Sequence, residues 1–212
     1  MSRLAFEITG VRAERYAVVP LLTFRLRITD FDDQPVNAIA LRAQIRIETT
    51  RRHYTGVEHE RLEDLFGIPQ RWGETLRSLL WTHVSAMVPR FCGSIEVDLP
   101  VPCTYDFDVA ASKYLNALDD GDVPLLMLFS GTVFNEGQNG FAVAQIPWEL
   151  EASYRMPARV WRDVMDFHFP NTAWIRLRKD TFDELCLFKT SRTLTTWDDA
   201  LAALLDAARE KR

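Results

Sequence analysis

The chain has 212 residues, of which 47% are hydrophobic and 26% are charged, and its net charge is −5 at pH 7. This composition excludes a disordered chain, and the length suits one large domain or a domain with a substantial appendage. The negative net charge argues against a general nucleic-acid-binding protein, because contacts with phosphates need a clustered positive surface.

Three observations concern the location of the protein. The longest apolar run, Val123–Phe129, is too short to span a bilayer, which takes about 20 residues. Met1–Glu7 contains neither a long apolar core nor a small-residue cleavage site, so we expect no signal peptide. The three cysteines, an odd and sparse set, favour reduced thiols over a disulfide framework. We therefore expect a cytoplasmic protein whose partners include neither membrane nor nucleic acid.

The first part of the chain is typical of β-structure. Leu4–Val11 alternates apolar and polar residues, and so do Phe24–Ile28 and Ile39–Ile47. A period of two residues places one side of a strand in the interior and the other in solvent. The stretch between the last two runs, Thr29–Asn37, is rich in Asp, Asn and Pro, which are common turn residues. We predict that Leu21–Glu48 forms a long hairpin that seeds a β-sandwich.

A helical insertion is predicted next, within Arg51–Trp81. Val57–Phe66 spaces its apolar residues as a helix does, and Gly67 is a suitable stop. Gln70–Trp81 predicts a second short helix, because its apolar residues also fall on roughly one face.

Strands are predicted to resume after the insertion and to complete the sandwich. A short helical turn is expected over Ala110–Leu118. Pro124–Phe134 is apolar on both faces, which is typical of a central strand buried on both sides. The runs predicted as strands are Thr82–Pro89, Ser94–Val101, Thr104–Val109, Pro124–Phe134 and Phe141–Trp148.

The pattern turns helical from Glu151 onward. Pro157 suits the first turn of a helix that runs to about Phe169. Thr181–Glu184 matches a capping box and predicts the start of a second helix. A third helix is predicted from Thr196, with acidic residues in its first turn and basic residues at its end, as the helix dipole favours.

Together these elements predict a mostly β, α+β fold. An antiparallel β-sandwich is expected over residues 1–150, with a two-helix insertion near residues 55–81. A C-terminal helical extension is expected over residues 151–212, packed on the sandwich.

The polar side of the predicted hairpin carries four arginines, namely Arg25, Arg27, Arg42 and Arg46. One interpretation is a basic surface for an anionic partner. The other, which we favour, is an ordinary solvent-exposed face, because opposite charges commonly pair across neighbouring strands. The carboxylates available for such pairing are those of Glu7, Glu96, Asp98, Asp106 and Asp108.

The sequence contains no complete catalytic or metal-binding motif. His59–Glu63 begins like the zinc-protease helix motif but lacks its second histidine. No two histidines have metal-ligand spacing, so a metal site would have to be assembled in space. Its candidate ligands are His83, Cys92, Cys103 and His168. An enzyme of unrecognised type would use acids such as Asp106 and Asp108, but no nucleophile or base occurs in a recognisable arrangement.

Six tryptophans are distributed over the insertion, the end of the sandwich and the tail. The favoured interpretation is that they pack the helices onto the sandwich, because tryptophan supplies a large buried area. The alternative is a groove between tail and sandwich whose aromatic walls hold a partner peptide, because tryptophan is over-represented at binding hot spots. The partner-binding candidates on this second interpretation are Arg71, Trp72, Trp81 and Trp174.

Several segments together carry a family resemblance: Arg51–Tyr54, Phe66–Pro69, Arg71–Gly73, Leu80–Ser85, Glu96–Phe107, Leu128–Phe134, Phe169–Asn171 and Trp174. Through them the chain resembles, over nearly its whole length, an uncharacterised bacterial family catalogued as a domain of unknown function. Genes of that family often accompany those of nickel–iron hydrogenases, so the resemblance implies an accessory or assembly role. It implies no catalytic or binding residues.

We therefore expect a non-enzymatic accessory protein that binds a partner protein and needs no cofactor. The resemblance implies a hydrogenase subunit or a maturation factor as this partner. The alternative is a metal- or cofactor-handling protein that uses His and Cys side chains.

Overall fold

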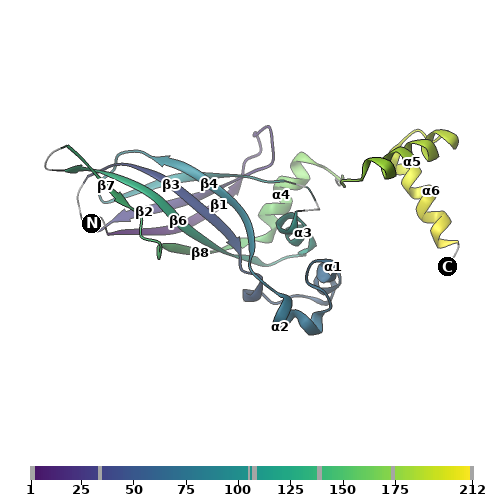
Figure 1. Cartoon of the computed structure of the whole chain (residues 1–212), viewed down its shortest axis with the longest axis horizontal. Helices are drawn as coiled ribbons and strands as arrows, with labels where there is room; N and C mark the ends of the chain where they lie inside the picture. Colours follow the sequence, from purple (N-terminus) through teal and green to yellow (C-terminus); the bar gives the residue numbers. More distant parts are fainter. Residues whose placement is uncertain are drawn as a thin grey trace. The chain divides into compact units, whose positions relative to one another are not determined.

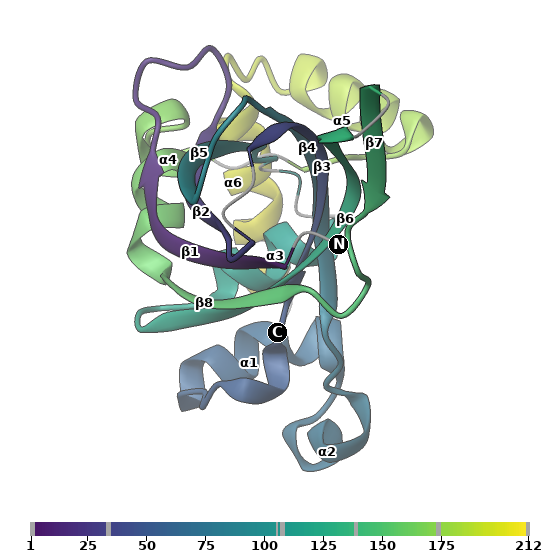
Figure 2. The ribbon, with the colours of Figure 1, turned by 90° about the vertical axis from the view of Figure 1, so that its left-hand side faces the viewer.

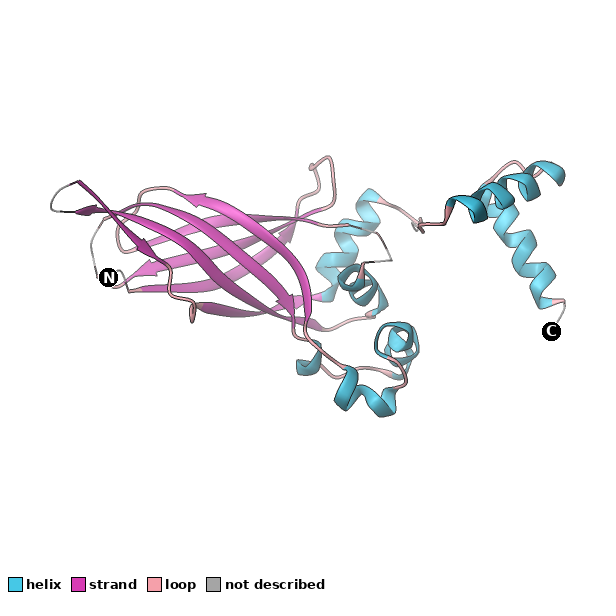
Figure 3. Cartoon of the chain, in the orientation of Figure 1, coloured by secondary structure: helices cyan, strands magenta, loops and turns pink. Residues whose placement is uncertain are grey.

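A computed structural model gives the fold of the chain (Figures 1 and 3). It describes residues 3–32, 35–104, 106, 109–137, 140–172 and 175–210. The contacts between residues divide the chain into two compact units, Met1–Trp174 and Ile175–Arg212. The first unit holds all the described strands and the helices α1 to α4, and the second holds α5 and α6.

The first unit is a β-sandwich of two antiparallel sheets (Figure 2). Sheet A has the strand order β1-β2-β5, and sheet B has the order β4-β3-β6-β7, with β8 also paired to β6. At the sheet edges β1 lies beside β8 and β5 beside β4, so the two sheets enclose one core. The predicted mostly β sandwich is thus confirmed. The strands are β1 (Leu4–Ala13), β2 (Leu21–Asp30), β3 (Val36–Ile47), β4 (Leu79–Val88), β5 (Ser94–Pro102), β6 (Asp122–Gly137), β7 (Gly140–Gln145) and β8 (Glu151–Pro157).

The hairpin predicted over Leu21–Glu48 is wrong. β2 pairs with β1 and β5, whereas β3 pairs with β4 and β6, so these consecutive strands lie in different sheets. The alternating pattern correctly gives the buried face of each strand, but it does not determine which strand lies beside it. The chain crosses the sandwich between β2 and β3 instead of turning back within one sheet.

The core lies between the inner faces of the two sheets. Phe24 and Ile28 of β2 and Ile39 of β3 are fully buried. Phe6 of sheet A stacks on Phe129 of sheet B, with their ring centroids 4.4 Å apart. These apolar contacts hold the two sheets together, and no hydrogen-bonded pairing joins sheet A to sheet B within the described strands.

The long strand β6 changes partner along one edge. Its first half pairs with β8 over Asp122–Leu128, and its last residues pair with β7 from Thr132 onward. Gly131 lies at the change, with a φ of 141° that side chains rarely adopt. A Cβ atom there would lie 2.0 Å from the carbonyl oxygen of Ala40 on β3. Glycine therefore allows β6 to lie against β3 while its outer edge changes partner.

The expectation that β6 is buried on both faces holds for one face only. Leu125, Met127 and Phe129 are buried in the core, whereas Leu126 and Leu128, which point outward, are only partly buried. The outer face of sheet B is therefore a surface with apolar residues on it.

Four helices pack at one end of the sandwich (Figure 1). The predicted helix over Val57–Phe66 is confirmed as α1, and it stops at Gly67, where φ is 76°. The second predicted helix, Gln70–Trp81, is shorter than expected, because α2 ends at Thr75 and β4 pairs with β3 from Leu79. The four helices are α1 (Gly56–Phe66), α2 (Trp72–Thr75), α3 (Ala110–Ala117) and α4 (Ala158–His168).

The segment that follows residue 150 begins with a strand and not with a helix. Glu151–Pro157 forms β8, because its backbone pairs with β6, and α4 begins directly after Pro157. Trp161 of α4 is fully buried, contacts the Trp81 ring of β4, and donates its Nε1 proton to Asn116 Oδ1 at 3.0 Å. Residues 151–174 thus belong to the unit that contains the sandwich.

The second unit consists of α5 (Lys179–Ser191) and α6 (Trp197–Arg209). The capping box predicted at Thr181 is wrong, because α5 already begins at Lys179. The helix predicted from Thr196 is confirmed, and Thr196 and Asp199 form its capping box. The packing of this unit on the sandwich stays a prediction.

Candidate functional site

The predicted tryptophan surface is not assembled in the described part of the chain. Trp72 is only 6% exposed, and its Nε1 donates to the Gly67 carbonyl oxygen at 2.7 Å. Trp81 is partly buried and packs edge-on against Phe24 and Trp161. Arg71 is exposed, and Trp174 lies outside the described residues. These placements favour the interpretation that tryptophans pack helices onto the sandwich.

A buried polar network lies beneath Trp72. The Tyr54 hydroxyl donates to the Thr49 carbonyl oxygen at 2.6 Å and lies 2.9 Å from the Tyr114 hydroxyl. Burial raises the pKa of both tyrosines, so both stay protonated. The buried Arg52 guanidinium donates to Glu58 Oε1 at 2.5 Å. The network joins α1 and α3 to the adjoining strand ends, and we assign it a structural role.

The four candidate metal ligands lie in separate places. His83 is exposed on β4, Cys92 is exposed before β5, and Cys103 is buried after β5. His168 ends α4, where its two ring nitrogens lie 2.9 Å and 3.1 Å from backbone carbonyl oxygens. Burial raises the pKa of the Cys103 thiol to about 12, which disfavours the thiolate that binds metal. In the described ranges, no group of three or more His, Cys, Asp or Glu residues could hold a metal ion.

The candidate acids of the enzyme hypothesis are only partly covered by the structure. Asp106 is partly buried, and its backbone N–H donates to Thr104 Oγ1 at 3.2 Å. Asp108 lies outside the described residues. Half of the residues of the strand predicted over Thr104–Val109, namely residues 105, 107 and 108, lie outside them too.

The outer face of sheet A carries a network of ion pairs. Arg25 Nε lies 2.7 Å from Asp98 Oδ1, and Arg27 Nη2 lies 2.9 Å from Glu96 Oε1. Arg12 also pairs with Asp98, at 2.8 Å. Hydrogen bonds from Arg27 lower the pKa of Glu96, and those from Arg12 lower the pKa of Asp98. For Arg25 and Arg27, the favoured interpretation of cross-strand neutralisation is confirmed.

The outer face of sheet B carries the other two arginines, with different neighbours. Arg42 is exposed and lies between Ser85 on β4 and Ser130 on β6 in the strand register. Arg46 donates from Nη2 to Ser78 Oγ at 2.5 Å. Among the residues that the structure describes, Arg42 has no ion-pair partner.

The carboxylates on this face lie towards its margins. Glu136 pairs with Arg90 at 3.5 Å, and Asp122 and Glu151 belong to the pairing of β6 with β8. The centre of the outer face of sheet B is therefore positive, whereas that of sheet A is neutralised.

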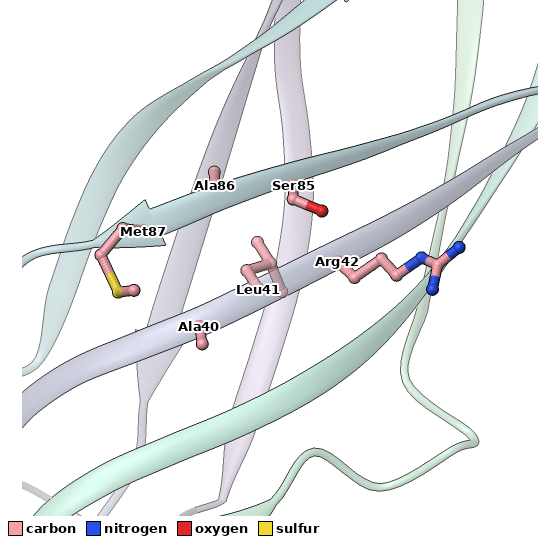
Figure 4. Close-up of a pocket in the computed structure, with 6 residues that line it drawn as sticks. All are labelled: Ala40, Leu41, Arg42, Ser85, Ala86 and Met87. Carbon is pink, nitrogen blue, oxygen red and sulfur yellow. The ribbon is translucent and has the colours of Figure 1, made fainter.

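A depression of about 340 Å³ lies between β3 and β4, next to Arg42 (Figure 4). Met87, opposite Ala40 in the register, is 70% exposed beside it. Figure 4 shows the Met87 side chain at one end of the depression and the Arg42 side chain at the other. The surface thus combines a cation with an apolar side chain. Its lining residues are Ala40, Leu41, Arg42, Ser85, Ala86 and Met87.

Within its own unit, the C-terminal helix pair leaves a large apolar side exposed. Of its described residues only Ala200 is buried. Leu187 of α5 is 72% exposed, and Leu205 of α6 is 58% exposed. The Phe182 and Trp197 rings contact each other, with centroids 5.3 Å apart, and yet both remain exposed.

Sequence reasoning missed two features of these surfaces. It grouped Arg42 with the arginines of β2, because the hairpin placed them on one sheet. Trp148, at 88% exposure the most exposed tryptophan in the described part of the chain, was not among its candidates.

The fold defines a β-sandwich protein with a helical cap and a C-terminal helix pair. No described helix has the length and apolar character needed to cross a membrane. The chain belongs to the family of unknown function DUF6084, whose model matches residues 1–212. No curated protein matches the sequence.

Solved structures give only weak likenesses. The CARDB domain of a Pyrococcus furiosus protein, solved with di-metal ions, is 9% identical, and the match covers 73% of this chain and 91% of that one with a TM-score of 0.28. A putative late embryogenesis abundant protein is 12% identical, with 73% and 69% covered and a TM-score of 0.31. A β-glucosidase from Kluyveromyces marxianus is 7% identical, with 73% and 15% covered and a TM-score of 0.27. Scores at this level do not establish a shared fold.

Proposed function

We propose that this protein is a non-enzymatic accessory protein that binds a partner protein through its C-terminal helix pair, in the maturation or assembly of a nickel–iron hydrogenase. The observation that carries the binding role is the apolar side that α5 and α6 leave exposed within their own unit. Leu187, Leu201 and Leu205 are all exposed on these two helices.

The energetics of the helix pair support a docking role. Chains of fewer than about 40 residues rarely bury enough apolar surface to fold without outside support. The unit Ile175–Arg212 is of this size, and its interior contains little beyond Ala200. Full burial of one leucine side chain contributes about 1.5–3 kcal/mol. A partner that covers the exposed leucines would therefore stabilise the helix pair and the complex together.

The hydrogenase part of the proposal has a different support. It rests on the resemblance to a family whose genes accompany those of nickel–iron hydrogenases, and the candidate partners are a hydrogenase subunit or a maturation factor. The geometry supports protein binding and is neutral on the identity of the partner.

The test is an affinity purification of the full-length protein from its native host, at native expression level, with identification of the co-eluting proteins. The informative variant carries Leu201→Glu and Leu205→Glu together. Ala202→Glu is the matched control, because Ala202 is exposed and lies on the polar side of α6 with Asp198 and Asp206. We expect hydrogenase subunits or maturation factors with the wild type and the control, and their loss with the double variant.

Two results would contradict the proposal separately. Recovery of the same proteins with the double variant would show that the helix pair is not the binding surface. Absence of hydrogenase proteins from the wild-type sample, under conditions that preserve known hydrogenase complexes, would remove the hydrogenase role.

A further inference from the structure

We infer that the outer face of sheet B is a second docking surface, which binds an acidic peptide segment of a partner protein by pairing a carboxylate with Arg42 and covering Met87 with an apolar side chain. This surface lies in the sandwich unit and is independent of the helix pair. The inference therefore goes beyond the proposed function and has its own test.

The first argument is the charge of Arg42. Its neighbours across β4 and β6 are Ser85 and Ser130, whose short side chains leave the guanidinium uncovered. No carboxylate of the described residues pairs with it, although the chain as a whole has a net charge of −5. An arginine held on a sheet among small residues can receive a carboxylate in the bidentate geometry that guanidinium favours.

The second argument is that sheet A pairs outward-facing arginines with carboxylates, whereas no carboxylate of the described residues pairs with Arg42 on sheet B. On sheet A, Arg25 and Arg27 each pair with a carboxylate on β5, directly across the strand pair. The same arrangement on sheet B would need acids at Ser85 or Ser130. Their absence from the centre of this face gives it the charge that complements an acidic segment.

The third argument is the apolar surface beside the cation. Met87 is 70% exposed, and its cross-strand neighbours on this face, Ala40 and then Thr132, are small. Met87 and Arg42 line the same depression between β3 and β4, at its opposite ends (Figure 4). Methionine adapts to varied apolar partners. His83, two residues before Ser85 on the same face, is exposed as well.

The partner chemistry follows from these neighbours. A segment with a carboxylate and an apolar side chain close together satisfies both Arg42 and Met87. A nucleic acid or an anionic lipid would offer the negative charge, but it would leave the exposed Met87 side chain without an apolar contact. We therefore assign the surface to an acidic, partly apolar peptide.

The experiment measures binding to the full-length protein by fluorescence anisotropy. The probe is a labelled short peptide that alternates glutamate and leucine, and the comparison peptide alternates lysine and leucine. We expect the glutamate peptide to bind and the lysine peptide not to bind. Arg42→Glu should weaken binding about tenfold or more, and Met87→Ala about threefold.

Arg159→Glu is the matched control, because it makes the same charge change at an exposed position on α4. It should leave the affinity unchanged if the surface is specific. Equal losses in Arg42→Glu and Arg159→Glu would show a general charge effect and overturn the inference. Equal binding of both peptides would overturn it as well. So would a protein that binds single-stranded DNA or anionic vesicles through Arg42 but does not bind the glutamate peptide.

Circular dichroism of each variant shows whether the fold is kept. Because Arg42 and Met87 are exposed and Arg42 has no ion pair in the described structure, both substitutions should leave the spectrum and the melting temperature close to those of the wild type. The Leu201→Glu and Leu205→Glu variant should bind the glutamate peptide normally. This result separates the present inference from the proposed function.

Discussion

Sheet A and sheet B each present arginines to solvent, but the neighbours of these arginines differ. On sheet A, Arg25 and Arg27 lie directly across from Asp98 and Glu96. On sheet B, Arg42 lies across from two serines. Both sheets contribute to one core, and their strands alternate buried and exposed residues in the same way. Burial of the core therefore does not by itself require this difference in the neighbours of the arginines. An exposed charge is informative about binding only when the cross-strand neighbours are known.

The largest expected difference between the sheets concerns their glycines. Gly131→Ala on sheet B should lower the free energy of unfolding by about 3 kcal/mol or more, because the new Cβ would meet the Ala40 carbonyl oxygen and the backbone conformation disfavours a side chain. Gly10→Ala on sheet A is the control, since a Cβ atom at Gly10 would have no atom within 4 Å and the φ there is ordinary. Urea unfolding of both variants measures the difference. Similar small losses in both would show that β6 does not need its glycine.

A charge reversal on each sheet tests the comparison directly. Arg25→Glu removes two ion pairs and places a third carboxylate beside Glu96 and Asp98, so it should lower the melting temperature by about 2–4 °C. Arg42→Glu has no pair to lose among the described residues and should change it by less than about 2 °C. Differential scanning calorimetry at low salt provides both values. A larger fall in melting temperature for Arg42→Glu than for Arg25→Glu would show that sheet B, and not sheet A, depends on its arginine for stability.

The smallest expected effect is a dependence of stability on acid pH. The pKa values of Glu96 and Asp98 lie below their ordinary values of 4.5 and 3.8 in the folded protein, because arginines donate hydrogen bonds to both. Their stabilising contribution is complete above the pKa values of the unfolded chain and disappears as the pH falls through the folded values. The variant with Glu96→Gln and Asp98→Asn should therefore lose less stability than the wild type on acidification below about pH 5.

Arg42→Gln serves as the control for the acid series, because it removes one charge from sheet B without touching these carboxylates. Chemical unfolding at a series of pH values gives the slopes. If the stability of the double variant falls with acid pH as steeply as that of the wild type, the ion pairs on sheet A contribute nothing measurable to stability.

Much of the fold was predictable because each element follows a local pattern. The alternation in Ile39–Ile47 gives the buried face of β3, and the apolar spacing before Gly67 gives α1 with its stop. The pairing of strands was not predictable in this way. The loop after β2 has the composition of a turn whether the next strand returns to the same sheet or enters the other one.

The candidate surfaces were less predictable than the fold, and for a related reason. The identity of Arg42 is visible in the sequence, but its serine neighbours follow from the register of β4 and β6. Residue type alone left two interpretations of the tryptophans, packing and a partner surface, with packing favoured. The position of Trp72 over Tyr54 depends on how the chain folds back after α1. The apolar spacing of α6 was visible too, but the pattern does not say what covers it.

The crossing of the chain between β2 and β3 also orders events during synthesis. β1 and β2 are neighbours in sequence and can pair as soon as they leave the ribosome. β3 must wait for β4, and then for β6, whose residue Val133 pairs with Ile39. Until then β3, the central strand of sheet B, is a nascent segment without its partners, and such segments are where chaperones bind and aggregation begins. The central position of β3 thus makes the protein depend on the late arrival of β6.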